Sequence, residues 1–184
     1  SHFLNLENSP LWRESTSCGV KSKRDLFHIC KPWIVRSDCQ RFFSVVKKVL
    51  TAPPKDPNSF KIVPSNKKCL SPLLRKNLVD TLVLLARNAQ SIQACESSEI
   101  EGEVARTVSE ILEHWDKDAY NAYDDCLESF ALAAPRTFLD FWEEQSELCR
   151  WMMRPVTNLF FEKSPRPAFL DALKILCWEE VTFE

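Results

Sequence analysis

Four side chains that could bind a metal ion lie near the amino terminus: Cys18, His28, Cys30 and Cys39. Structural zinc sites usually take their ligands in pairs about two to four residues apart, because such a pair fixes half of the tetrahedron locally. Only His28 and Cys30 are close together, and a single residue separates them. This spacing favours packing of the four side chains in the N-terminal region, so we expect no cofactor. A zinc site on the same four residues is the alternative.

Few other groups are suited to catalysis. The chain has three histidines and contains no metalloprotease, nucleophile-elbow, nucleotide-loop or Cys-x-x-Cys motif. His114 shares one helical stripe with Glu110 and Asp118, which would favour its protonated form, but an isolated histidine in an acidic stripe is typical of a solvated surface. Adjacent carboxylates such as Asp124 and Asp125 do not face each other on a helix. We therefore expect no enzymatic activity.

The eight cysteines are spread along the whole chain, without the close spacing of a disulfide-rich domain. On an apolar helix face a free thiol packs as a small hydrophobic group. Residues 1–30 contain no apolar segment typical of a signal peptide, and the longest aliphatic stretch, residues 82–86, is too short to span a membrane. We expect a reduced intracellular protein, nuclear or cytoplasmic, with no membrane partner. Because the chain begins with Ser1, we also expect a fragment of a larger protein.

Glycine is nearly absent, since Gly19 and Gly102 are the only two in the 184 residues. Sheet-rich folds and nucleotide-binding loops need glycine where φ is positive or where a ligand approaches the backbone. The hydrophobic fraction of 45% is too high for a disordered chain. We expect one all-α domain over residues 1–184, an irregular antiparallel array of six to seven helices in a HEAT- or armadillo-like stack or a bundle. Residues 1–22 lack periodicity and are expected to form an extended arm or loop.

Two helices are predicted ahead of the longest loop. The first covers residues 23–31 and stops at Pro32. The second is capped by Ser37 or Asp38 and ends before the proline-rich loop, residues 52–69. The three-four spacing predicts one buried face on this helix, formed by Phe42, Val45, Val46, Val49 and Leu50.

Ser71 followed by proline predicts the start of a long helix that is apolar over much of its circumference and forms the centre of the fold. Its most deeply buried residues are expected to be Leu78, Leu82 and Leu85. Ser98 and Glu101 then form a capping-box pattern at the start of the next helix. Gly102 inside that helix suggests a close approach of a neighbouring helix.

Three further helices complete the prediction. One is capped by Asp116 or Asp118 and runs to Ala134, and the next runs from Pro135 to Pro155. The last opens at Ser164 and is expected to bury Phe169, Leu170, Leu173, Leu176 and Cys177.

The net charge of −2 conceals a strong asymmetry. Residues 1–95 hold 16 Lys and Arg against six Asp and Glu, whereas residues 96–184 hold eight against 20. The chain thus has a basic half, residues 23–95, and an acidic half, residues 96–184. Antiparallel packing of the helices that flank the proline-rich loop would gather a basic patch, which we define as Lys47, Lys48, Lys67, Lys68, Arg75 and Lys76.

Three interpretations of this asymmetry compete. The halves either solvate different faces or neutralise each other across an internal interface, since exposed charge pairs contribute little specific energy. Alternatively, the two surfaces select protein partners of opposite charge, or the basic half binds nucleic acid through phosphate contacts. No helix-turn-helix, RRM or KH pattern supports the last interpretation, and the basic loop lacks aromatic residues for base stacking apart from Phe60. We expect a protein–protein interaction domain of the scaffold or adaptor type; the alternative is a nucleic-acid-binding helical domain. The oligomeric state is not predicted.

Overall fold

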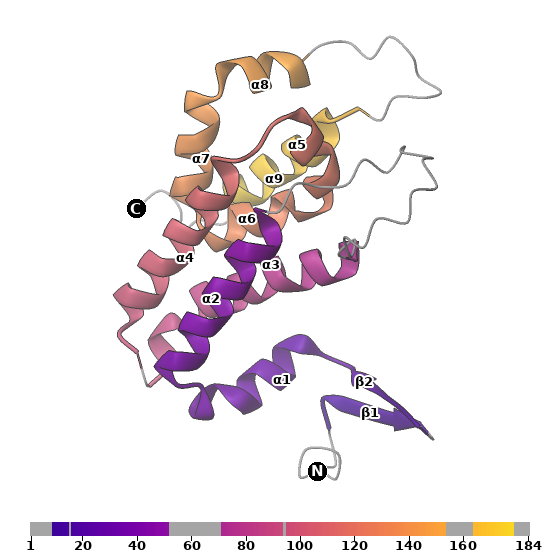
Figure 1. Cartoon of the computed structure of the whole chain (residues 1–184), viewed down its shortest axis with the longest axis vertical. Coiled ribbons are helices and arrows are strands. Elements are labelled where there is room, and N and C mark those ends of the chain that lie inside the picture. The colour runs from indigo at the N-terminus through magenta and orange to yellow at the C-terminus, as the bar shows by residue number, and fades with distance from the viewer. Residues whose placement is uncertain (1–8, 15, 52–70, 94, 154–163, 179–184) are drawn as a thin grey trace.

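The computed structural model describes residues 9–14, 16–51, 71–93, 95–153 and 164–178, and these are mostly helical (Figure 1). A β-hairpin, β1 (Leu11–Glu14) and β2 (Ser17–Val20), precedes α1 (Lys23–Cys30) and the 3₁₀ turn η2 (Lys31–Trp33). The remaining elements are α2 (Arg36–Leu50), α3 (Pro72–Arg87), η3 (Ala89–Ser91), α4 (Ser97–Leu112), α5 (Lys117–Tyr123), η4 (Asp124–Cys126), α6 (Leu127–Ala133), α7 (Pro135–Glu144), α8 (Ser146–Met152) and α9 (Arg166–Trp178). The all-α class is confirmed. None of the described helices is long and apolar enough to cross a membrane.

The larger helices pack in two rows. In one row α4 contacts both α2 and α7, and in the other α6 contacts both α3 and α9. Contacts of α3 with α2 and α4, and of α6 with α4 and α7, join the rows. Wholly buried side chains come from both rows, among them Val46, Val79, Leu82, Val104, Val108, Ile111, Phe130, Phe138 and Ala172. The rows therefore share one hydrophobic core.

α4 lies at the centre of the first row because one side of it is continuously apolar. Ile100, Val104, Val108, Ile111 and Leu112 are all buried, as their spacing predicts. The helix begins at Ser97, two residues earlier than the capping-box pattern predicts, and its N-cap residue Glu96 makes no capping hydrogen bond through its side chain. The expected close approach at Gly102 is wrong, because a Cβ added there would meet no atom within 4 Å.

α3 stands at one end of the second row, where it packs against α2, α4 and α6. Its buried face differs slightly from the prediction. Leu82 and Leu85 are buried, whereas Leu78 is half-buried and Val79 is wholly buried in its place. The apolar face continues past the helix end through Ala89 and Ile92, which are also buried. The predicted start at Ser71-Pro72 is confirmed.

Two helices that the periodicity predicts as continuous are each broken in the structure. The first is capped by Asp116, whose Oδ1 accepts a hydrogen bond from the backbone N–H of Ala119 at 2.8 Å, but η4 divides it into α5 and α6. The second breaks at Gln145, where ψ is 57° and the helix cannot continue. Beyond the second break, Leu148 and Met152 in α8 are buried.

Helices at the ends of the rows expose residues that the periodicity predicts to be buried. Val45 on α2 is 47% exposed, and on α9 Leu170 is 48% exposed and Cys177 is also exposed. An end helix has a neighbour in its row on one side only, so its apolar face is covered less widely than that of α4. α2 also begins at Arg36, ahead of the expected cap, and Asp38 accepts a hydrogen bond from the backbone N–H of Val35 at 3.2 Å.

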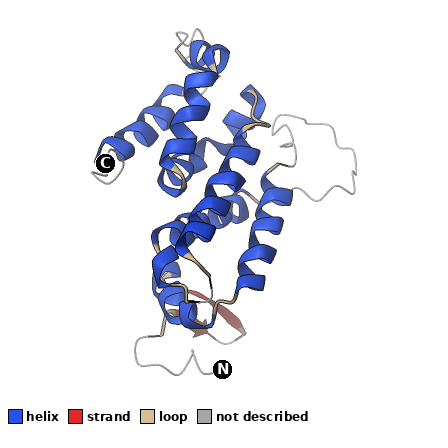
Figure 2. Cartoon of the chain, turned by 90° about the vertical axis from the view of Figure 1, so that its left-hand side faces the viewer, coloured by secondary structure: helices blue, strands red, loops and turns tan. Residues whose placement is uncertain are grey.

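The hairpin is the main secondary structure that the sequence analysis did not predict; Figure 2 shows its strands at one end of the molecule. Leu11–Glu14 pairs antiparallel with Ser17–Val20, and Trp12 lies opposite Gly19. A Cβ on Gly19 would lie 2.6 Å from Trp12 Nε1, so the indole packs against a position that has no side chain. Strands of four residues are too short for an alternating pattern to distinguish them from a loop.

Candidate functional site

The six residues of the basic patch do not share one environment. Lys67 and Lys68 lie outside the described residues. Lys48 and Lys76 are exposed, and Lys47 and Arg75 are half-buried in contacts within the fold. Lys48 and Lys76 are thus the described members that remain open to a partner.

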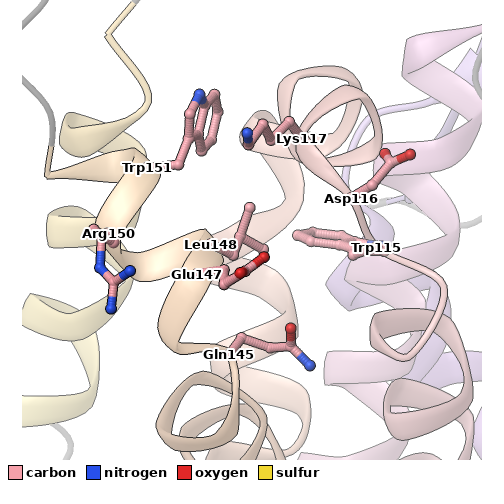
Figure 3. Close-up of a pocket in the computed structure, with 8 residues that line it drawn as sticks. All are labelled: Trp115, Asp116, Lys117, Gln145, Glu147, Leu148, Arg150 and Trp151. Carbon is pink, nitrogen blue, oxygen red and sulfur yellow. The ribbon is translucent and has the colours of Figure 1, made fainter.

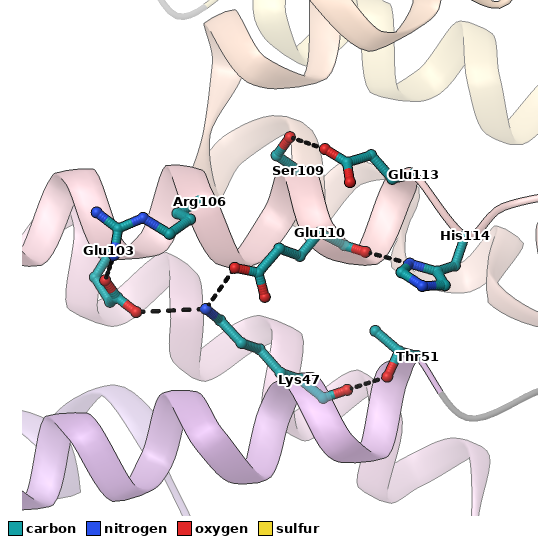
Figure 4. Close-up of polar contacts among 8 residues, drawn as sticks. All are labelled: Lys47, Thr51, Glu103, Arg106, Ser109, Glu110, Glu113 and His114. Atoms are coloured by element: carbon teal, nitrogen blue, oxygen red, sulfur yellow. Dashed lines mark hydrogen bonds and ion pairs between the residues drawn. The ribbon is translucent and has the colours of Figure 1, made fainter.

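Lys47 lies at the seam between α2 and α4, as Figure 4 shows. Its Nζ is 2.9 Å from Glu110 Oε1 and 3.5 Å from Glu103 Oε1, and Arg106 reaches the other oxygen of Glu103 at 2.6 Å. The Lys47 side chain is 25% exposed, so its charge is held close to both carboxylates and partly shielded from solvent. Glu103 and Glu110 are seven residues apart on one stripe of α4, which is the sequence signal that could have identified this pairing.

Arg75 is held at the start of α3. Its guanidinium carbon is 4.8 Å from the centre of the Tyr123 ring, a cation–π contact. Burial raises the pKa of the Tyr123 hydroxyl, and a hydrogen bond from Arg75 partly offsets this. Arg75 therefore ties α3 to the end of α5.

The two charged halves neutralise each other along α2 and α4. Besides the contacts of Lys47, Arg36 near the start of α2 forms an ion pair with Glu99 in the first turn of α4. The basic half also pairs internally, because Lys23 Nζ is 2.6 Å from Asp80 Oδ2. Part of the charge asymmetry is therefore used within the fold.

A separate hollow of roughly 590 Å³ opens between the α4–α5 turn and α8 (Figure 3). Trp115, Asp116 and Lys117 line it on one side, and Gln145, Glu147, Leu148, Arg150 and Trp151 line it on the other. We call these eight residues the α5–α8 hollow. The Asp116 cap sets one wall and the break at Gln145 sets the other, so both walls depend on local backbone features.

The floor of the α5–α8 hollow is built on packed aromatic rings. Trp115 stacks on Tyr123 with ring centres 5.7 Å apart, and Trp151 meets Tyr120 edge to face at 5.6 Å. The Tyr120 hydroxyl donates a hydrogen bond to the carbonyl oxygen of Pro165 at 2.6 Å, which links this cluster to the start of α9. Trp115 is buried, so the half-buried Trp151 supplies most of the aromatic surface that is open in the hollow.

Charged side chains of both signs surround that surface. Lys117 and Arg150 are exposed cations, and Asp116 and Glu147 are exposed anions. The groups whose pKa values burial raises most, Cys39, Tyr120 and Cys126, are not among its lining residues. An apolar floor with a polar rim resembles the anatomy of a protein interface more than that of a catalytic pocket.

The chemical groups considered from the sequence are placed as follows. His114 is exposed, and its Nδ1 donates a hydrogen bond to the Glu110 carbonyl oxygen at 2.7 Å. His28 and Cys30 lie on α1 and Cys39 lies on α2, while the Cys18 side chain is outside the part that the structure describes. Within that part, no three histidine, cysteine or carboxylate side chains gather as a metal site.

The α5–α8 hollow was missed from the sequence. The helical spacing predicts that Trp151 belongs to the core, and the structure finds it half-buried at the rim of the hollow. The break at Gln145 moves it there, and neither proline nor glycine marks that break.

No protein-family model matches the chain, and neither the curated proteins nor the solved structures include one that is significantly similar to it.

Proposed function

We propose that this chain is a protein–protein interaction domain of the scaffold or adaptor type, acting within a larger intracellular protein. The observation that carries the proposal is the α5–α8 hollow, where the half-buried Trp151 packs on Tyr120 and lies among exposed charges of both signs. Tryptophan and arginine are enriched among the residues that dominate binding energy at protein interfaces. The free thiols among the described cysteines support a reducing compartment, nuclear or cytoplasmic.

We further propose that the two rows form a short stack of the HEAT or armadillo kind. If α5 with α6, and α7 with α8, are each counted as one bent helix, the described residues form seven helices. On this count the principal contacts join each helix to the next and to the next but one. Such serial packing is the arrangement of stacked helical pairs, which use extended surfaces for binding.

We propose that only the charges left exposed by the fold, rather than the two whole halves, attract partners of opposite charge. Since Arg36 and Lys47 are paired with α4, the exposed cations Lys48 and Lys76 are left to attract an acidic partner. On the acidic side, Glu143, Glu144 and Glu147 are exposed at the α7–α8 break, next to the α5–α8 hollow. Rim charges of this kind steer association more than they hold the complex.

The test compares two double reversals after a partner has been identified by pull-down and mass spectrometry. Lys117→Glu with Arg150→Glu changes the rim of the α5–α8 hollow, and Lys48→Glu with Lys76→Glu changes the exposed part of the basic patch. All four side chains are exposed, so both variants should keep the wild-type melting temperature within a few degrees. If the α5–α8 hollow is the main contact, the first variant should weaken binding of the purified partner by ~10-fold or more, a loss of about 1.4 kcal/mol.

Equal binding by both variants and the wild-type protein would refute the proposal. The same proteins should be titrated with labelled DNA and RNA over a salt series. Binding that weakens steeply with salt and is lost in the Lys48→Glu, Lys76→Glu variant would instead support the nucleic-acid-binding alternative.

A further inference from the structure

The outward face of α9 is more apolar than the solvent side of a helix usually is. α9 ends the second row and packs against α6 and η4, and its buried residues are Phe169, Ala172 and Leu176. On the opposite side of the helix lie its six exposed residues, which are Pro167, Leu170, Asp171, Lys174, Cys177 and Trp178. A helix that packs on one side normally carries charged and polar residues on the other, but four of these six are apolar, and Trp178 is 78% exposed. Exposed apolar faces of this kind mark contact surfaces.

Four of the exposed residues form a nearly straight stripe along α9. Pro167, Asp171, Lys174 and Trp178 follow one another at intervals of four, three and four residues, which is the spacing of one helix face. The stripe has the same order from either end: a ring, two charges and a ring. Because the two central charges have opposite signs, the stripe is complementary to a copy of itself that runs in the reverse direction.

We propose that α9 pairs with α9 of a second copy of this chain, antiparallel and about a two-fold axis. The axis passes between residues 172 and 173. Asp171 of each copy then faces Lys174 of the other, and Pro167 of each copy lies against Trp178 of the other. Such a closed contact uses the same surface on both copies, so each pairing occurs twice.

The two central charges are available for this contact. Asp171 and Lys174 are three residues apart, a spacing at which side chains on a helix can pair. Neither of them takes part in an ion pair among the described residues, and both are exposed. A parallel arrangement would place like charges opposite each other, so the charges favour the antiparallel one. Trp178 is the residue most suited to supply binding energy, since tryptophan is enriched at the energetic centres of interfaces.

The contact is small. α9 has 13 residues and is therefore about 20 Å long. One pair of such helices buries less surface than a stable protein–protein interface, so we expect a weak dimer with a Kd of ~10–100 µM. This inference does not depend on the proposed binding function, because no residue of α9 lines the α5–α8 hollow.

The first test follows the mass of the whole chain by sedimentation velocity, in dithiothreitol and over concentrations that bracket the expected Kd. The wild-type mass should rise from that of one chain toward that of two. Asp171→Lys and Lys174→Asp each place four like charges at the centre of the contact, so each should raise the Kd by ~10-fold or more. The double variant Asp171→Lys, Lys174→Asp exchanges the charges and should restore the dimer. These side chains are exposed, so the melting temperatures should stay within a few degrees.

The matched control is Asp140→Lys on α7. Asp140 is also exposed, and its reversal changes the net charge by the same amount as Asp171→Lys, so the Kd should stay at the wild-type value. A second measurement mixes unlabelled with ¹⁵N-labelled chain and couples carboxylates to lysines with a carbodiimide. Peptide mass spectrometry should find Asp171 of one isotope linked to Lys174 of the other.

Three results would each overturn the proposal. The first is a wild-type chain that stays monomeric over the whole concentration range. The second is a pair of single reversals that dimerise like the wild-type chain, or a double variant that dimerises no better than they do. The third is crosslinking between copies that joins other residues and leaves Asp171 and Lys174 unlinked.

Discussion

Lys47 gives the sharpest test of how the two charged halves are used. Reversal of Lys47 to glutamate removes its attraction to Glu103 and Glu110 and places a third carboxylate beside them. Unit charges about 4 Å apart interact by about 1 kcal/mol in water and about 4 kcal/mol at an effective dielectric constant near 20. Because the Glu110 side chain is 41% exposed, the lower part of that range applies. The expected loss is about 2 kcal/mol of unfolding free energy.

Lys48 is the matched control for this reversal. It follows Lys47 in the last turn of α2, so both lysines interact similarly with the helix dipole, but Lys48 is exposed. In a protein of this size, about 1 kcal/mol corresponds to roughly 2–4 °C in melting temperature. Thermal unfolding followed by circular dichroism should therefore place Lys47→Glu about 4–8 °C below Lys48→Glu. High salt should narrow this gap.

The double variant Lys47→Glu, Glu110→Lys tests the pairing directly. It restores opposite charges across the seam and should recover part of the loss, which a double-mutant cycle would report as a coupling energy. Equal melting temperatures for Lys47→Glu and Lys48→Glu would show that the contacts of Lys47 contribute nothing, and the reasoning would be refuted.

Four further predictions follow from the core and from the titrating groups. Leu82→Ala should cost about 2–5 kcal/mol in urea unfolding because Leu82 is wholly buried, whereas Leu73→Ala on the same helix, 68% exposed, should cost less than about 0.5 kcal/mol. Gly102→Ala should raise the unfolding free energy by about 0.5–1 kcal/mol in the same assay, since a Cβ at this position in α4 meets open space. A lower unfolding free energy would mean that a neighbouring residue lies closer to Gly102 than it does in the structure. Thr107→Val should also raise the unfolding free energy, by roughly 1 kcal/mol, because the Thr107 hydroxyl is buried without a hydrogen-bond partner among the described residues. A decrease of similar size would show that the hydroxyl has a partner. The unfolding free energy should fall as pH rises from about 9 to about 11, because burial raises the pKa of Cys39 and the folded protein keeps a proton that the unfolded chain has lost. The unfolding free energy of Cys39→Ser should fall less over the same interval.

Local sequence signals predicted where several helices begin. Ser71 with the following proline begins α3, Asp116 caps α5, and Pro135 begins α7. These signals act within one turn of helix, through a capping hydrogen bond or a fixed φ angle, so they need no tertiary contact. The buried face of α4 was predicted for a similar reason. Apolar residues three and four apart form a continuous stripe along one helix, and this spacing is visible in the sequence of that helix alone.

Residues at the ends of the rows were less predictable. The spacing of Val45 and Leu170 places each of them on the apolar face of its helix. How much of that face a neighbouring helix covers depends on the position of the helix in its row, and both residues remain exposed. The break at Gln145 is a related case. It carries Trp151 to the rim of the α5–α8 hollow, and no residue near it is a strong helix breaker.

Composition and periodicity by themselves determined that this protein is all-α, because the near absence of glycine and the three-four apolar spacing are properties of single segments. Which charges are neutralised and which remain exposed was decided only by the tertiary structure. Lys47 and Lys48 are adjacent and chemically identical, yet the turn of α2 directs Lys47 toward Glu103 and Glu110 and leaves Lys48 exposed. Contacts between distant segments depend on the packing of the whole core, and no local pattern in the sequence records them.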